Sequence, residues 1–253
     1  MTGARPGLGG QMARAAQAYG WLTRGRYDLV QDRTASRAAP QPAPRGLPMT
    51  LTVDDITTDH QAYAATRAEA RKRMIPVRAE RRVRVGDIVA FEFENLDTLR
   101  YQVQEMVYTE RLTERADVAH EIEIYGRLMP SSHALTATMF VELRATESVR
   151  EELAHLAGLQ YAIALEIDGE TASAEEIRGL ARCVRVLVEA ADTPSETVSV
   201  HMFRFPLTDE QRDKFRDPEV PVELVVDHEA YNDSTPIEGA TRKSLIADLT
   251  LRS

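Results

Sequence analysis

Hydrophobic and polar residues alternate in several short segments of the chain, as they do along strands with one buried face. The clearest case is Ile88 to Phe93, in which Val89, Phe91 and Phe93 alternate with an alanine and glutamates. This period of two residues predicts strands rather than helices. Strands are predicted at 88–93, 135–143, 161–167, 198–205 and 222–228.

Other segments place apolar residues three or four positions apart, which is the spacing of an amphipathic helix. Thr58 or Asp59 is suited to cap the first of them, and Asn95 the second, because their side-chain oxygens accept from free first-turn amides. Pro76 predicts a kink or an end within the first helix. Helices are predicted at 59–81, 96–112, 117–128, 147–157, 174–181, 209–215 and 237–251.

The order of these elements favours an α+β fold with a mainly antiparallel sheet of about five strands packed with helices. Strands and helices follow one another without the regular rhythm of parallel crossover units. The helices at 96–112 and 117–128 are joined by a short turn, so we expect them to form an antiparallel helix pair.

The first 48 residues differ in composition from the rest of the chain. They hold seven arginines and two aspartates, a net charge of +5, which leaves −14 for residues 49–253. The segment ends in a proline and alanine run at 38–44, which favours extended, unpacked chain. We predict a flexible extension over 1–48, with Met49 as the natural start, and a single α+β domain over 49–253. The alternatives for the extension are a transit peptide and a nucleic-acid-binding arm.

Composition excludes several classes of protein. The single cysteine, Cys183, rules out a disulfide framework, a four-cysteine zinc site and a self-contained iron–sulfur cluster. The net charge of −9 opposes a large nucleic-acid interface, and no apolar run reaches the roughly 20 residues of a membrane span. The sequence also lacks a P-loop, a dinucleotide glycine fingerprint and a nucleophile-elbow serine. We predict a soluble, cytoplasmic protein that binds neither nucleic acid nor membrane.

Two glutamates continue the apolar faces of the helix pair. Leu99, Val103 and Met106 share one helix face, and Glu110 follows at the next step of four residues. Glu121 stands among the apolar residues of the next helix. A buried carboxylate needs a cation, a metal ion or a shared proton, so these two glutamates are a candidate site. The arginines that would provide ion pairs instead are Arg100, Arg144 and Arg204.

A further polar line follows another face of the first of these helices. It predicts a polar seam against the sheet, which is either a structural face, hydrogen-bonded or solvated, or part of a site. The residues of the seam are Glu94, Asn95, Thr98, Gln102, Glu105 and Thr109, with Tyr231 as an additional polar candidate.

Two histidines stand on apolar strand faces. His201 shares its face with Phe203 and Phe205, and His228 ends the strand at 222–228. Histidine and carboxylate together are the ligands that non-haem iron favours. The candidate ligands for iron or another divalent metal are Glu105, Glu110, Glu121, His201 and His228. Neither helix carries the Glu-x-x-His step of di-iron bundles.

Four blocks of sequence resemble one bacterial family. They are FENLDTLRYQVQEM at 93–106, TATMFVEL at 136–143, VHMFRF at 200–205 and VDHEAY at 226–231. Together they identify residues 49 to about 251 as similar to the family catalogued as domain of unknown function 3501. Members of that family are often encoded beside rubrerythrin-like di-iron proteins and cysteine-rich iron–sulfur proteins. The resemblance therefore implies a redox or oxidative-stress setting.

Two hypotheses follow, and the sequence leaves open whether the protein is an enzyme. The first is a non-catalytic accessory module that docks on a rubrerythrin-like or iron–sulfur redox protein. The second is a metal-dependent enzyme with a glutamate and histidine site. Close approach of a histidine to two of the carboxylates favours the metal site, whereas arginine partners favour the accessory module. The oligomeric state stays open.

Overall fold

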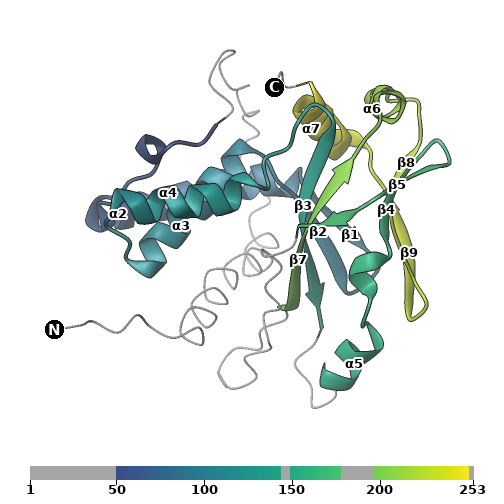
Figure 1. The fold of residues 1–253 in the computed structure, drawn as a ribbon, viewed down its shortest axis with the longest axis horizontal. Helices are drawn as coiled ribbons and strands as arrows, with labels where there is room; N and C mark the ends of the chain where they lie inside the picture. Colours follow the sequence, from purple (N-terminus) through teal and green to yellow (C-terminus); the bar gives the residue numbers. More distant parts are fainter. Residues whose placement is uncertain (1–49, 144–148, 178–196, 251–253) are drawn as a thin grey trace, which may run out of the picture.

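The computed structural model describes residues 50–143, 149–177 and 197–250 of the chain. Within them, helices α2 (His60–Ala79), α3 (Leu96–Glu110) and α4 (Arg115–Gly126) cover one side of a five-stranded sheet. A four-stranded sheet lies on the other side, so the molecule has a helical layer and two sheet layers (Figure 1). The prediction of an α+β fold with antiparallel pairing is confirmed.

The five-stranded sheet, here called sheet A, lies in the middle of the three layers. Neighbouring strands are antiparallel throughout, and the strand order is β1-β2-β3-β7-β6. The strands are β1 (Arg82–Val85), β2 (Val89–Phe93), β3 (Ala134–Glu142), β7 (Thr197–Pro206) and β6 (Glu175–Glu176).

The second sheet, sheet B, is also antiparallel and has the order β5-β4-β8-β9. Its strands are β5 (Glu170–Ser173), β4 (Ile163–Ile167), β8 (Val222–His228) and β9 (Tyr231–Pro236). Its edge strand β9 reaches sheet A, because the Thr235 hydroxyl donates to the Arg84 carbonyl of β1 (2.7 Å). At its other edge the chain passes through Ala174 directly from β5 into β6 of sheet A.

Two apolar cores lie on the two faces of sheet A. Alternation along β2 sends Phe91 and Phe93 into the core between the sheets, where helix α7 (Gly239–Leu249) adds Leu245 and Leu249. The other core joins sheet A to α3 and α4 through residues such as Leu99. The strand alternation therefore leaves Glu92 of β2, and Glu94 just after it, facing the helices.

Side-chain caps explain where the main helices begin. Asp59 accepts from the amides of Gln61 and Ala62 at the start of α2, and Asn95 accepts from the Thr98 amide at the start of α3. The remaining helices are α5 (Val149–His155), α6 (Asp209–Arg216) and the short 3₁₀ turns η3 (Val53–Asp55) and η4 (Leu159–Tyr161). No helix in the described ranges is both long and apolar enough to cross a lipid bilayer.

Three local predictions differ from the structure. Of the two effects predicted for Pro76, an end of the helix is wrong, because α2 continues to Ala79, and a kink stays a prediction. The carbonyl that loses its partner belongs to the exposed Lys72, where water can satisfy it. The helix predicted at 174–181 is wrong in its described part, because Glu175 and Glu176 pair with β7. Strands β1, β5 and β9 were not predicted, and β6 was assigned to a helix. The extension over 1–48 and Cys183 lie outside the described residues.

One turn requires glycine. Gly86, between β1 and β2, has φ +58°, and an added Cβ would lie 2.3 Å from the Tyr231 hydroxyl oxygen. That hydroxyl cannot move freely, since it donates to the Val85 carbonyl (2.7 Å) and accepts from the Ile88 amide (3.3 Å). We expect Gly86→Ala to lower the free energy of unfolding by about 2 kcal/mol, measured by urea denaturation.

Gly239→Ala is the matched control for this prediction. Gly239 also has a positive φ, +57°, but an added Cβ meets nothing within 4 Å. We expect a smaller loss there, from backbone strain alone. Equal losses in the two variants would contradict the role assigned to the Tyr231 contact.

Candidate functional site

The predicted polar seam contains a fully buried carboxylate, Glu94, between sheet A and α3. Its Oε2 accepts from the Thr98 hydroxyl and its Oε1 from the Thr138 hydroxyl, both at 2.6 Å. Burial, reinforced by the nearby Glu92 carboxylate, raises the pKa of Glu94 above its ordinary value of 4.5, although both hydroxyls oppose the shift. Glu94 therefore gives up its proton less readily than an exposed glutamate does.

This raised pKa predicts a specific pH dependence. The folded state holds the Glu94 proton more tightly than the unfolded state, so its contribution to stability is complete below pH 4.5. The contribution is lost as the pH rises through the raised value. We expect Glu94→Gln, which cannot ionise, to gain stability relative to the wild type as the pH is raised from 5 to 8, measured by urea denaturation.

Glu94→Ala separates charge from hydrogen bonding. It leaves the buried Thr138 hydroxyl without its acceptor, whereas the Thr98 hydroxyl can still donate to the Asn95 carbonyl (3.0 Å). We therefore expect a loss of about 1–3 kcal/mol even at low pH. A constant difference between Glu94→Gln and the wild type from pH 5 to 8 would contradict the raised pKa.

Glu92 faces the same layer but is neutralised by arginine. Its carboxylate is 2.7 Å from Nε of Arg78, at the end of α2, and 3.7 Å from Nη1 of Arg82 in β1. Nearby, Glu142 of β3 contacts Arg84 and is 2.6 Å from Nη2 of Arg82. The buried acids are thus compensated by Arg82 and Arg84 of the edge strand β1 and by Arg78 of α2.

Glu105, another residue of the predicted seam, ties α2 to α3. It is 1% exposed and accepts from Nη2 (2.7 Å) and Nε (3.0 Å) of Arg67 and from the Tyr63 hydroxyl (2.8 Å). Two contacts to one guanidinium fix the position of the Arg67 side chain. Burial, followed by the hydrogen bond to Glu105, raises the pKa of Tyr63, so its hydroxyl stays protonated as a donor.

A groove with a volume of about 560 Å³ opens beside this ion pair, between α2 and α3. The Arg67 guanidinium lies 4.9 Å from the centre of the Tyr108 ring, a cation–π distance. Arg71 and Lys72 stand on the α2 wall, and no acidic side chain within the described ranges forms an ion pair with either. We call this the α2–α3 groove, and its charged and aromatic residues are Arg67, Arg71, Lys72, Tyr101, Glu105 and Tyr108.

The predicted glutamate pair does not form a buried centre. Glu110 is the last residue of α3 and is half-buried rather than directed into the core, because the apolar face ends with Val107. Glu121 on α4 is also half-buried and has an interaction partner. Of the arginines suggested as partners, Arg100 lies near Asp55 and Asp97 and Arg204 donates to the Arg127 carbonyl, whereas Arg144 lies outside the described residues.

The two histidines lie in other parts of the fold. His201 Nδ1 is 2.9 Å from a Glu176 carboxylate oxygen on β6, and its ring stacks on Phe203. His228 donates from Nε2 to the Ala157 carbonyl (3.1 Å) and accepts at Nδ1 from the Ala230 amide (3.2 Å). Across the described ranges, no three histidine, cysteine, aspartate or glutamate side chains are grouped so that they could hold a metal ion.

Tyr231 is not part of the seam, because it lies in sheet B, where its hydroxyl anchors the β1–β2 turn. Asn95 caps α3, and Gln102 is buried on the same helix. The seam therefore divides into structural residues and Glu94 and Glu105, which are buried carboxylates with identified partners.

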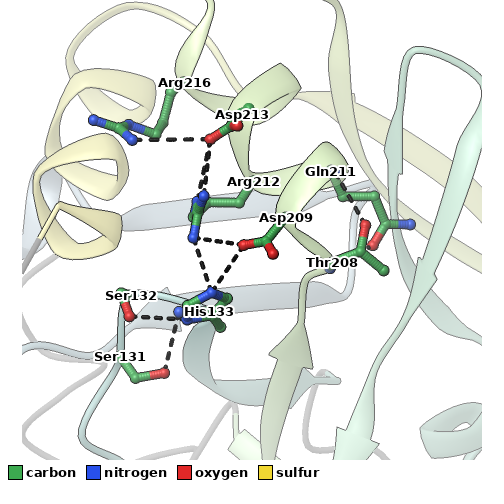
Figure 2. Close-up of polar contacts among 9 residues, drawn as sticks. All are labelled: Ser131, Ser132, His133, Thr208, Asp209, Gln211, Arg212, Asp213 and Arg216. Atoms are coloured by element: carbon green, nitrogen blue, oxygen red, sulfur yellow. Dashed lines mark hydrogen bonds and ion pairs between the residues drawn. The ribbon is translucent and has the colours of Figure 1, made fainter. Parts of the chain in front are cut away.

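An exposed polar cluster lies where β3 begins beside α6 (Figure 2). His133 Nδ1 is 2.9 Å from the Ser132 hydroxyl, and its Nε2 is 3.1 Å from Asp209 and 2.8 Å from Nη1 of Arg212. The order serine, histidine, aspartate resembles a hydrolytic triad. However, the His133 side chain is 55% exposed, and Arg212 and Asp209 both contact its Nε2 atom. We therefore interpret the cluster as a surface hydrogen-bond network that joins the loop before β3 to α6.

Sequence reasoning missed the cationic wall of the groove. The signal available was the Arg71-Lys72-Arg73 run on a predicted helix, together with two tyrosines seven residues apart, Tyr101 and Tyr108. Their meeting depends on how α2 crosses α3. Such a contact between distant segments leaves no local pattern.

The fold and the groove define an α+β domain with a cationic, tyrosine-lined helix pair on one sheet face. The chain belongs to the family described as protein of unknown function (DUF3501), which matches residues 50–249. This confirms the resemblance found in the sequence.

A solved structure shares this fold. It is described as a novel protein of unknown function from Burkholderia pseudomallei K96243 and is 30% identical to this chain. The match covers 79% of this chain and 99% of that one, with a TM-score of 0.67. The search of curated proteins found no match.

Proposed function

We propose that the protein is a non-catalytic accessory module that docks an acidic segment of a partner protein in its α2–α3 groove. The observation that carries the proposal is the groove itself, where Arg67 is held in place by Glu105 while Arg71 and Lys72 stand beside tyrosine rings. Fixed cations next to aromatic faces are suited to carboxylates on a peptide chain.

The charge distribution supports an acidic partner. Helix α2 carries five basic residues and one acidic residue, whereas the whole chain has a net charge of −9. Opposite charges steer a partner towards a cationic helix and set its orientation. A long polyanion such as nucleic acid would meet the acidic remainder of the surface, which disfavours it.

The partner classes in this proposal come from the resemblance described above. The setting implied by the resemblance is redox or oxidative-stress chemistry, and the partner classes are rubrerythrin-like and iron–sulfur proteins. In this proposal the metal chemistry resides in the partner. Two of the residues predicted as metal ligands support this, because each has a partner within the protein. Glu105 forms an ion pair with Arg67, and His201 contacts Glu176.

Isothermal titration calorimetry with a purified rubrerythrin-like protein and a purified iron–sulfur protein of the same organism tests this function. We expect one of them to bind, and the variant Arg71→Glu/Lys72→Glu to bind about tenfold more weakly or worse. Raising the salt concentration should weaken binding of the wild type more than that of the variant.

Arg216→Glu/Lys243→Glu is the matched control, because it makes the same change in net charge on α6 and α7. We expect it to bind the partner nearly as well as the wild type. Equal weakening by both double variants would show an effect of net charge and would contradict docking in the groove.

A further inference from the structure

A second cavity lies on the other side of α2. Its volume is about 370 Å³, and it is lined by residues of the η3 segment, α2 and α3. It shares only Tyr101 with the α2–α3 groove, because the α2 residues of the two cavities stand on opposite flanks of the helix. A ligand in this cavity would be independent of a partner in the groove.

The floor of the cavity is apolar. Ala70 and Met74 of α2 are 9% exposed and Tyr101 of α3 is 7% exposed, and Val77 extends the same surface. An apolar group placed there would lose contact with water at little steric cost, which is the usual source of small-ligand affinity. The floor thus selects for a ligand with an apolar body.

The rim carries two cations and two anions. Arg100 is 3.8 Å from Asp55 and 3.5 Å from Asp97, longer than the 2.7–2.9 Å typical of a charge-assisted hydrogen bond. Arg73 is exposed and forms no ion pair within the described part of the chain. The hydroxyl and amide of Thr52 donate to Asp55 and lower its pKa, so that carboxylate is ionised at neutral pH.

Hydrogen bonds fix one wall of the cavity. The Gln104 side chain accepts from the Thr57 amide (2.8 Å) and donates to the Thr57 carbonyl (2.9 Å). These two bonds hold the segment that carries Asp55 against α3. A preformed cavity binds a small molecule without a cost for ordering the chain.

We propose that this cavity binds a free apolar α-amino acid. Arg73 and Arg100 would receive its carboxylate, Asp55 and Asp97 its ammonium group, and the floor of Ala70, Met74 and Val77 its side chain. A rim that carries both charges above an apolar floor suits a zwitterion. A simple anion would be repelled by the two aspartates, and a simple cation by the two arginines.

Isothermal titration calorimetry of the full chain with L-phenylalanine and L-leucine tests the proposal. We expect at least one of them to bind at a single site. Glycine lacks the apolar side chain, N-acetyl-L-phenylalanine lacks the ammonium charge and phenethylamine lacks the carboxylate. Each of these should bind at least about tenfold more weakly, the equivalent of one lost charge-assisted contact or buried side chain.

Variants locate the site. Arg100→Gln should weaken binding of the amino acid about tenfold, and Val77→Phe should abolish it by filling the floor. Lys72→Gln, in the α2–α3 groove, should leave it unchanged, which separates this site from partner docking. Thermal unfolding followed by circular dichroism checks that each variant is folded.

Absence of binding by both amino acids would overturn the proposal. So would equal binding of N-acetyl-L-phenylalanine, because it would show that the acidic half of the rim plays no part. Equal loss in the Lys72→Gln variant would place the ligand in the groove instead and would also contradict it.

Discussion

Arg81→Met is expected to lower the free energy of unfolding by about 3–5 kcal/mol, the largest loss predicted for this protein. Arg81 is 1% exposed and forms an ion pair with Asp248 of α7. It also donates to the carbonyls of Phe93 (2.7 Å) and Glu94 (2.8 Å) and to the Ser244 hydroxyl (2.8 Å). Removing the guanidinium leaves a buried carboxylate and two carbonyls without their donor.

The loss is measured by urea denaturation, with two control variants. Burial raises the pKa of Asp248 and Arg81 opposes that shift, so the double variant Arg81→Met/Asp248→Leu, which removes the buried charge, should recover part of the loss. Arg115→Met removes an ion pair with Asp54 that is exposed on both sides, and should cost less than about 1 kcal/mol. A loss in Arg81→Met no larger than in Arg115→Met would contradict the role of the buried pair.

Glu105→Ala is expected to lower the free energy of unfolding by about 3 kcal/mol. The substitution removes the acceptor of both Arg67 and Tyr63, and Tyr63 is buried. The Arg67 side chain is 40% exposed and can be hydrated again, which keeps the loss at the lower end of the range for broken buried pairs.

The same substitution should loosen α2. This helix buries only Tyr63, Ala70 and Met74, so Glu105 provides much of its attachment to α3. We expect faster amide hydrogen exchange in α2 of Glu105→Ala, and little change in Glu110→Ala, which alters a half-buried residue of the same helix. Unchanged exchange in α2 would contradict the function of Glu105 as its anchor.

The fold was predictable wherever a local pattern decides the structure. The alternation in Val222–His228 gave the strand limits of β8, and Asn95 marked the start of α3. Strand β9, Tyr231–Pro236, was missed because its polar residues and terminal proline are typical of a loop, while as an edge strand it tolerates both.

The candidate site was predictable only in part, because its contacts join segments that are far apart in the chain. The helical pattern placed Glu105 in a polar seam but did not show that it is buried, because its burial depends on α2 crossing α3. Its partner Arg67 is 38 residues away in the chain and has no pattern that marks it. Glu110 continues the apolar spacing, yet it is the last residue of α3 and is only half-buried.

The most direct test of docking is hydrogen–deuterium exchange of the protein with and without its redox partner, read by mass spectrometry. The account predicts slower exchange on binding in peptides covering residues 64–75 and 101–108, which form the α2–α3 groove. It predicts a clearly smaller change in the Arg71→Glu/Lys72→Glu variant at the same concentrations. Binding that slows exchange only elsewhere, for example in sheet B, would contradict the account.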